Sequence, residues 1–101
     1  AVSGSGPAYM YQILEALADG AVLAGLPRAT AYQLAAQTMA GSAMMLLETG
    51  EHPGVLKDQV TSPGGTTIRA LKVMEEKGVR SAMIEAVQQA YLRSKELGET
   101  E

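Results

Sequence analysis

The residues best suited to chemistry are gathered in one short stretch, Val60-Thr61-Ser62-Pro63-Gly64-Gly65-Thr66-Thr67. Its hydroxyl groups and unhindered backbone N–H groups come directly before an apolar segment with helical spacing. Gly64 and Gly65 allow a turn through backbone angles that other residues avoid, and they let a ligand approach the main chain. A carboxylate or phosphate would then lie on the first N–H groups of a helix that begins near Thr66, where the helix dipole favours negative charge. A purely structural alternative stays open, in which the glycines only lead the chain into a helix with Thr66 as its N-cap.

Three other features are weaker candidates for chemistry. Glu15 and Asp19 lie one helical turn apart, which would suit acid–base catalysis or a metal ion but is also typical of a solvated helix face. His52 is the only histidine and has no partner at metal-ligand spacing, so we expect a surface or structural role for it. The methionines between residues 39 and 45 could line a pliable ligand groove, although methionine at helical spacing more often fills a core. The sequence therefore predicts no metal site.

The composition predicts one helical domain. A chain of 101 residues is enough for a single domain, and its richness in Ala, Met and Leu favours closely packed helices over a sheet. There is no Phe or Trp, and the only aromatic residues are four tyrosines, so one chain would bury a thin core. We therefore expect association with another copy or another domain. The absence of cysteine excludes disulfides, Cys–zinc sites and thiol catalysis.

Charge and hydropathy exclude two classes of partner. The net charge is −3 and the Lys and Arg residues are scattered, so we expect no nucleic-acid binding. No apolar run approaches the roughly 20 residues needed to cross a bilayer, and no signal-peptide pattern opens the chain, so we expect no membrane association. The chain opens on Ala1 without an initiator Met, which suggests a fragment of a longer protein, although processing could also remove that residue.

Glycine and proline divide the chain into five expected helices. Their ranges are Ser5-Gly6-Pro7 to about Ala24, about Pro27 to Glu48, a short segment over 55–60, Thr66 to about Lys77, and Val79 to about Leu97. Residues 98–101 are expected to fray. The predicted inward residues of the first helix are Tyr11, Leu14, Leu17, Ala18, Ala21 and Val22, and those of the last are Met83, Ile84, Val87, Ala90, Tyr91 and Ser94. Small and apolar residues surround most of the second helix, which favours an all-α, interlocked homodimeric bundle over a closed monomeric one.

The order of several motifs resembles pyrroline-5-carboxylate reductase. The run Asp58-Gln59-Val60-Thr61-Ser62-Pro63-Gly64-Gly65-Thr66-Thr67-Ile68-Arg69-Ala70-Leu71 is similar to the signature of that family. The other matching segments are Ser3-Gly4-Ser5-Gly6-Pro7-Ala8-Tyr9, Glu15-Ala16-Leu17-Ala18-Asp19-Gly20, Gly25-Leu26-Pro27-Arg28, Ala36-Gln37-Thr38, Leu46-Leu47 and His52-Pro53-Gly54. The resemblance spans Ala1 to about Leu97 and favours a ligand-binding role for the Gly-Gly turn.

The resemblance implies that residues 1–101 are a C-terminal dimerisation and substrate-binding domain. The whole enzyme of that family reduces L-Δ1-pyrroline-5-carboxylate to L-proline with NADPH or NADH, the last step of proline biosynthesis, and works as a dimer or a higher assembly. Its N-terminal Rossmann domain has no counterpart in this chain, because no G-x-G-x-x-G follows a strand and Ser3-Gly4-Ser5-Gly6 opens a helix instead. We therefore expect this chain alone to bind no cofactor and to be inactive. The family implies a cytoplasmic location, or a mitochondrial one if the source is eukaryotic.

The same resemblance assigns roles within the turn. The substrate is a small cyclic imine with one carboxylate, so Ser62 Oγ and the backbone N–H groups of Gly65 and Thr66 are expected to hold that carboxylate, with Gly64 shaping the turn. Thr67 Oγ is expected to hydrogen-bond the ring nitrogen and orient it. Two alternatives remain. One is a pure interaction module whose turn binds nothing, and the other is the helical domain of a related Rossmann dehydrogenase that acts on another small carboxylate.

Overall fold

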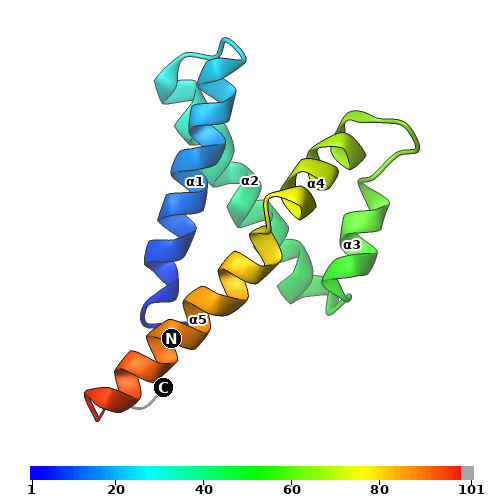
Figure 1. The fold of residues 1–101 in the computed structure, drawn as a ribbon. Coiled ribbons are helices and arrows are strands. Elements are labelled where there is room, and N and C mark those ends of the chain that lie inside the picture. Colours follow the sequence, from blue (N-terminus) through cyan, green and yellow to red (C-terminus); the bar gives the residue numbers. More distant parts are fainter. Residues whose placement is uncertain (99–101) are drawn as a thin grey trace. The chain divides into compact units, whose positions relative to one another are not determined.

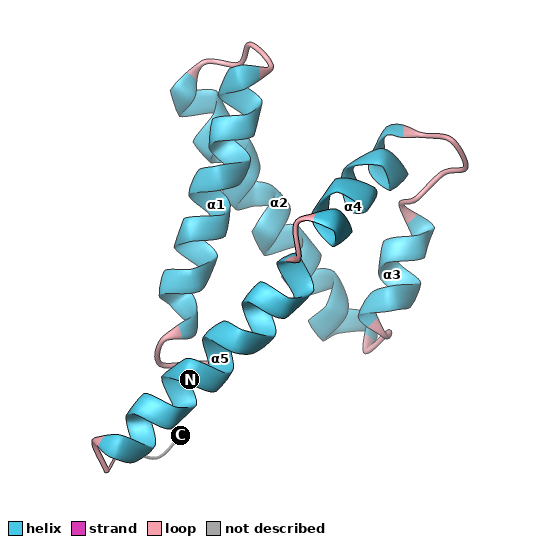
Figure 2. Ribbon diagram, viewed as in Figure 1, coloured by secondary structure: helices cyan, strands magenta, loops and turns pink. Residues whose placement is uncertain are grey.

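A computed structural model describes residues 1–98, and their regular structure is entirely helical (Figure 1). The helices are α1 (Gly6–Leu23), α2 (Arg28–Thr49), α3 (Pro53–Gln59), α4 (Thr66–Glu76) and α5 (Val79–Glu96). Figure 2 shows the short loops that join them, and no strand occurs in this part of the chain. The predicted all-α fold is confirmed. The expected fraying of the tail falls, beyond Gly98, outside the described residues.

The chain divides into two compact units. One is the α1–α2 unit, Gly6–Gly50, and the other joins residues 1–5 to α3, α4 and α5. Across residues 1–98, none of the helices is both long enough and apolar enough to cross a membrane.

The α1–α2 unit is a helical hairpin whose corner follows from two residues. The N–H of Gly25 donates to the carbonyl of Val22 at 2.9 Å, and the N–H of Leu26 donates to that of Ala21 at 3.0 Å. This is the Schellman pattern that ends a helix, and it requires the positive φ of 112° that Gly25 adopts. Pro27 then occupies the N-cap position of α2. Gly25 and Pro27 together therefore determine where the chain reverses between α1 and α2.

Alanine forms the seam between α1 and α2. Ala18 and Ala31 are fully buried, and Ala35 is nearly so. Side chains this small let two helix backbones approach closely, and further apolar residues pack against the seam. Those partly buried neighbours are Leu14, Ala21 and Val22.

Asp19 takes part in a structural ion pair. Arg28 Nη1 lies 2.5 Å from Asp19 Oδ1, and its guanidinium stacks over the Tyr32 ring at 5.5 Å from the centroid. The hydrogen bond to Asp19 raises the pKa of Arg28 above its usual value. Because both charged groups are about half exposed, the pair adds little stability, and the alanine seam is the stronger constraint on the hairpin.

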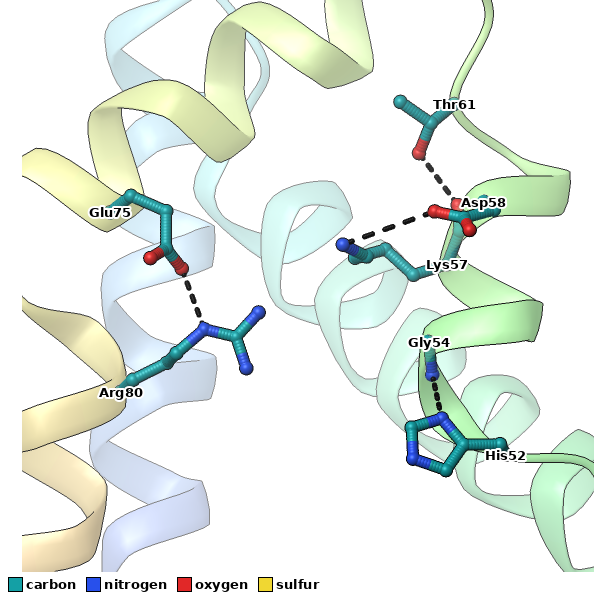
Figure 3. A network of polar contacts seen from close by, with 7 residues as sticks. All are labelled: His52, Gly54, Lys57, Asp58, Thr61, Glu75 and Arg80. Carbon is teal, nitrogen blue, oxygen red and sulfur yellow. Dashed lines mark hydrogen bonds and ion pairs between the residues drawn. The ribbon is translucent and has the colours of Figure 1, made fainter.

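The corner between α4 and α5 uses the same combination of glycine and an ion pair. Gly78 has φ of 74° and precedes α5, and its N–H donates to the carbonyl of Glu75 at 3.2 Å. The side chains of Glu75 and Arg80 then meet across the corner, with 2.8 Å between Oε1 and Nε (Figure 3).

Several apolar residues predicted to face inward are exposed in the single chain. Tyr11 is 71% exposed and Ile84 is 68% exposed, and Leu17 and Tyr91 also remain about half exposed. Helical spacing placed these side chains on common faces correctly, but the described chain offers too little surface to cover them. Met44 and Met45 are likewise about half exposed, so they do not fill a core within this chain.

A substitution in the seam tests its importance. Ala31→Leu should lower the free energy of unfolding of the chain by about 1–3 kcal/mol, because the added carbons have no space between the two helices. Urea unfolding followed by circular dichroism measures the change. The matched variant Ala16→Leu, at an exposed α1 position, should change stability by less than about 0.5 kcal/mol. Equal effects of the two substitutions would contradict the assignment of the seam.

Candidate anion-binding turn

His52 caps the first end of α3. Its backbone is extended, and its Nδ1 accepts a hydrogen bond from the N–H of Gly54 at 2.9 Å, while Pro53 opens the helix (Figure 3). This satisfies one of the N–H groups that a helix start leaves free. A Cβ on Gly54 would lie 3.0 Å from that Nδ1, so the close contact depends on glycine. The predicted structural role of His52 is confirmed.

Thr61 caps the other end of α3. Its hydroxyl Oγ1 donates to the carbonyl of Lys57 at 2.6 Å, and its N–H donates to the carbonyl of Asp58 at 3.1 Å. Figure 3 shows the Thr61 side chain directed back at the helix. These two hydrogen bonds of Thr61 therefore fix the direction in which the backbone continues to Ser62.

Residues 62–65 form a tight turn with the features of type II. The N–H of Gly65 donates to the carbonyl of Ser62 at 3.1 Å, Pro63 occupies the second position, and Gly64 in the third has φ of 67°. The predicted unusual backbone angle is thus confirmed at Gly64. It is wrong at Gly65, whose φ is −85°. Gly65 instead relieves crowding, because a Cβ there would lie 3.3 Å from the Ser62 carbonyl oxygen, a tight contact.

The turn leads directly into α4. Gly65 is the N-cap without a side-chain hydrogen bond, so Thr66 is the first helical residue and its predicted role as the N-cap is wrong. The N–H of Gly65 is already engaged within the turn, which corrects the expectation that it is free for a ligand. Within residues 1–98, the backbone N–H groups of Thr66 and Thr67 and the hydroxyls of Ser62 and Thr67 make no hydrogen bond.

The free donors of the turn suit an anion. The first turn of α4 has no acidic side chain, so the positive end of the helix dipole is not neutralised there. Ser62 is exposed and Thr67 is half-buried. A small carboxylate could therefore accept hydrogen bonds from the helix start and from one hydroxyl, while a second hydroxyl stays available for another atom of the same molecule.

Other kinds of site find no comparable support in residues 1–98. No group of three or more His, Asp or Glu side chains there could hold a metal ion. No strand is present among them, so they do not form the strand, glycine loop and helix that hold a dinucleotide. An open groove of about 670 Å³ on the α1–α2 unit is lined by Ala8, Tyr11, Gln12, Leu14, Glu15 and Tyr32.

The fold and the turn define an all-helical domain with exposed apolar side chains and a polar turn suited to a small anion. Residues 1–97 match the family model described as pyrroline-5-carboxylate reductase dimerisation, and the chain belongs to this family. The resemblance inferred from the motifs is thereby confirmed.

Individual relatives agree with the family match. The chain is 60% identical over 99 residues to the pyrroline-5-carboxylate reductase of Escherichia coli strain K12, covering 98% of this chain and 37% of that protein. It is 64% identical over 97 residues to the reductase of a Synechocystis strain, covering 96% of this chain and 36% of that protein. The chain thus spans little more than a third of the length of these relatives.

Solved structures show the same fold. The pyrroline-5-carboxylate reductase of Coxiella burnetii gives a TM-score of 0.92 at 47% identity, covering 98% of this chain and 37% of that one. The pyrroline carboxylate reductase of Plasmodium falciparum, solved with NADP bound, gives a TM-score of 0.92 at 37% identity, covering 97% of this chain and 40% of that one.

The caps of α3 were not predicted as a pair from the sequence. The signals were present, because His52 precedes a proline and Thr61 follows Lys57 at the spacing of one helical turn. They were missed because histidine is an uncommon cap and because threonine beside a Gly-Gly turn suggests ligand binding more readily than capping.

A double-mutant cycle tests the His52 cap. Gly54→Ala should lower the free energy of unfolding by about 0.5–2 kcal/mol, because the new methyl group displaces the imidazole from its hydrogen bond. In a His52→Ala background the same substitution should instead raise stability by up to about 1 kcal/mol, since alanine favours helix over glycine. Urea unfolding of the four proteins gives both values. The same sign and size in both backgrounds would refute the cap.

Proposed function

We propose that this chain is the C-terminal dimerisation and substrate-binding region of a pyrroline-5-carboxylate reductase. The whole enzyme reduces L-Δ1-pyrroline-5-carboxylate to L-proline with NADPH or NADH. The observation that supports this best is the family match over residues 1–97, together with free donors in the part of the chain that carries the family-like signature. In this proposal the cofactor is held mainly by the rest of the enzyme, and this chain is inactive alone.

The turn binds the substrate carboxylate in this proposal. Ser62 Oγ and the backbone N–H groups of Thr66 and Thr67 donate to its oxygens, while the N–H of Gly65 keeps the turn closed. Gly64 supplies the positive φ of the turn, and Gly65 leaves room beside Ser62. These donors are held by local hydrogen bonds before the substrate arrives, which lowers the entropy cost of binding.

Thr67 acts on the reacting part of the molecule. Its side chain belongs to the same first turn of α4 as the N–H donors of Thr66 and Thr67, so one ligand can contact both when its carboxylate and ring nitrogen are close together, as in a five-membered cyclic imino acid. The Thr67 hydroxyl hydrogen-bonds that nitrogen and stabilises the proton it bears in the iminium form. A threonine hydroxyl is a weak acid, so this role is orientation rather than proton donation.

The exposed apolar faces support self-association. Tyr11 of α1, Met44 of α2 and Ile84 of α5 present large apolar areas to solvent in one chain. A second copy that covers these faces would supply the core that one chain lacks, in an interlocked dimer.

Removal of one hydroxyl tests the proposed chemistry. In the full-length enzyme, Thr67→Ala should lower kcat/KM for pyrroline-5-carboxylate by about 10- to 100-fold, because a hydrogen bond to a charged group is lost. Thr67→Ser keeps the hydroxyl and should stay within about threefold of wild type. Steady-state kinetics with the substrate varied measure both. If Thr67→Ala also stays within about threefold, the assigned role is wrong.

A further inference from the structure

We propose that Thr61 and His52 are positioning residues for substrate binding, acting through α3 on the turn that follows it. This inference rests on the proposed function of the turn. Neither residue contacts the substrate in the proposal. They determine instead where Ser62 and the turn that it opens are held.

Helix α3 depends on its caps. It has only seven residues and none of them is buried. A helix of fewer than two turns is marginal in water because the nucleation cost is spread over few hydrogen bonds. Within residues 1–98, α3 also makes no extensive contact with another helix. The helical conformation of α3 therefore depends strongly on the capping hydrogen bonds at its two ends.

The caps of α3 are linked directly to the donors of the turn. Thr61 is covalently joined to Ser62, and its Oγ1 and N–H both bind carbonyls of the last turn of α3. His52 anchors the opposite end through Gly54. Loss of either cap would let α3 fray and would free the chain before Ser62, so that only the hydrogen bond between Gly65 and Ser62 would still hold Ser62 at the start of α4.

A matched threonine on α2 separates a positioning effect from an effect on general stability. Thr38 on α2 makes the same kind of bond as Thr61, from its Oγ1 to the carbonyl of Leu34 at 2.8 Å. Thr38 lies inside a long helix of the α1–α2 unit, whereas Thr61 lies at a helix end beside the turn. The two threonines therefore form a matched pair with equal hydrogen-bond chemistry and different predicted effects on the substrate.

The test is steady-state kinetics of the full-length enzyme with pyrroline-5-carboxylate and NADPH varied separately. Thr61→Val should raise KM for pyrroline-5-carboxylate about three- to tenfold, with KM for NADPH within about twofold of wild type. Thr61→Ser should restore the wild-type value, because it retains the hydroxyl. Thr38→Val should leave both KM values within about twofold of wild type.

Substitution of His52, at the other end of α3, provides a second and independent test. His52→Ala should raise KM for pyrroline-5-carboxylate by a similar factor, and His52→Asn should restore it, since asparagine is a favourable N-cap. Circular dichroism of each variant reports whether the protein is folded. If Thr61→Val folds poorly, the His52 pair decides the question.

The outcomes separate this inference from the function on which it rests. Ser62→Ala should raise KM for pyrroline-5-carboxylate if the turn binds the carboxylate. An effect of Ser62→Ala without any effect of Thr61→Val or His52→Ala overturns only the positioning role. No effect of Ser62→Ala overturns the proposed site and this inference with it. An equal rise in both KM values for Thr61→Val, or an equal effect of Thr38→Val, would show general destabilisation and also overturn the inference.

Discussion

The main constraint on this protein is that one chain has almost nothing large to bury. The residues that form its hydrophobic seam are alanines, Ala18, Ala31 and Ala35, and every large apolar side chain of the described part keeps some exposure. Alanine allows helices to approach closely but removes little apolar area from water. The α1–α2 hairpin is therefore well defined in geometry and weakly stabilised by its own contacts. A second surface is needed before the apolar faces of α1, α2 and α5 become a core.

The turn before α4 does not depend on a hydrophobic core, because it is built from local interactions. The hydrogen bond between Ser62 and Gly65, the positive φ of Gly64 and the two bonds of Thr61 all join residues close in sequence. None of them requires a large core. The geometry of the donors is thus set by turn chemistry and capping, while the stability of the whole is proposed to depend on association. This separation lets a domain with a thin core present a well-ordered turn with free hydrogen-bond donors.

The helix ends and the turn were predictable from the sequence, because they depend on residues that lie close together along the chain. Gly25, Gly50 and Gly78 marked helix ends that the structure places at those points, and Pro63-Gly64 marked the turn. The order of the motifs along the chain was specific enough to indicate the family. The catalytic role of Thr67 remains a prediction, because residues 1–98 alone carry no test of it.

The predictions that are wrong concern residues whose type fits either of two structural roles. Gly65 was expected to supply an unusual backbone angle and a free N–H, but it supplies space beside Ser62 and uses its N–H to close the turn. Tyr11 and Ile84 were assigned to an interior from their helical spacing, and both are largely exposed. Periodicity identifies a common face of a helix, but it does not say whether the same chain or another one covers that face.

The most direct test of this account is the solution mass of the chain, measured by light scattering over a wide concentration range with circular dichroism on the same samples. The account predicts a helical dimer with twice the 10.6 kDa mass of one chain, stable on dilution because the apolar faces of α1, α2 and α5 are buried only in the pair. A well-folded helical monomer over the same range would contradict it, since that result would show that the alanine seam and the local turns suffice.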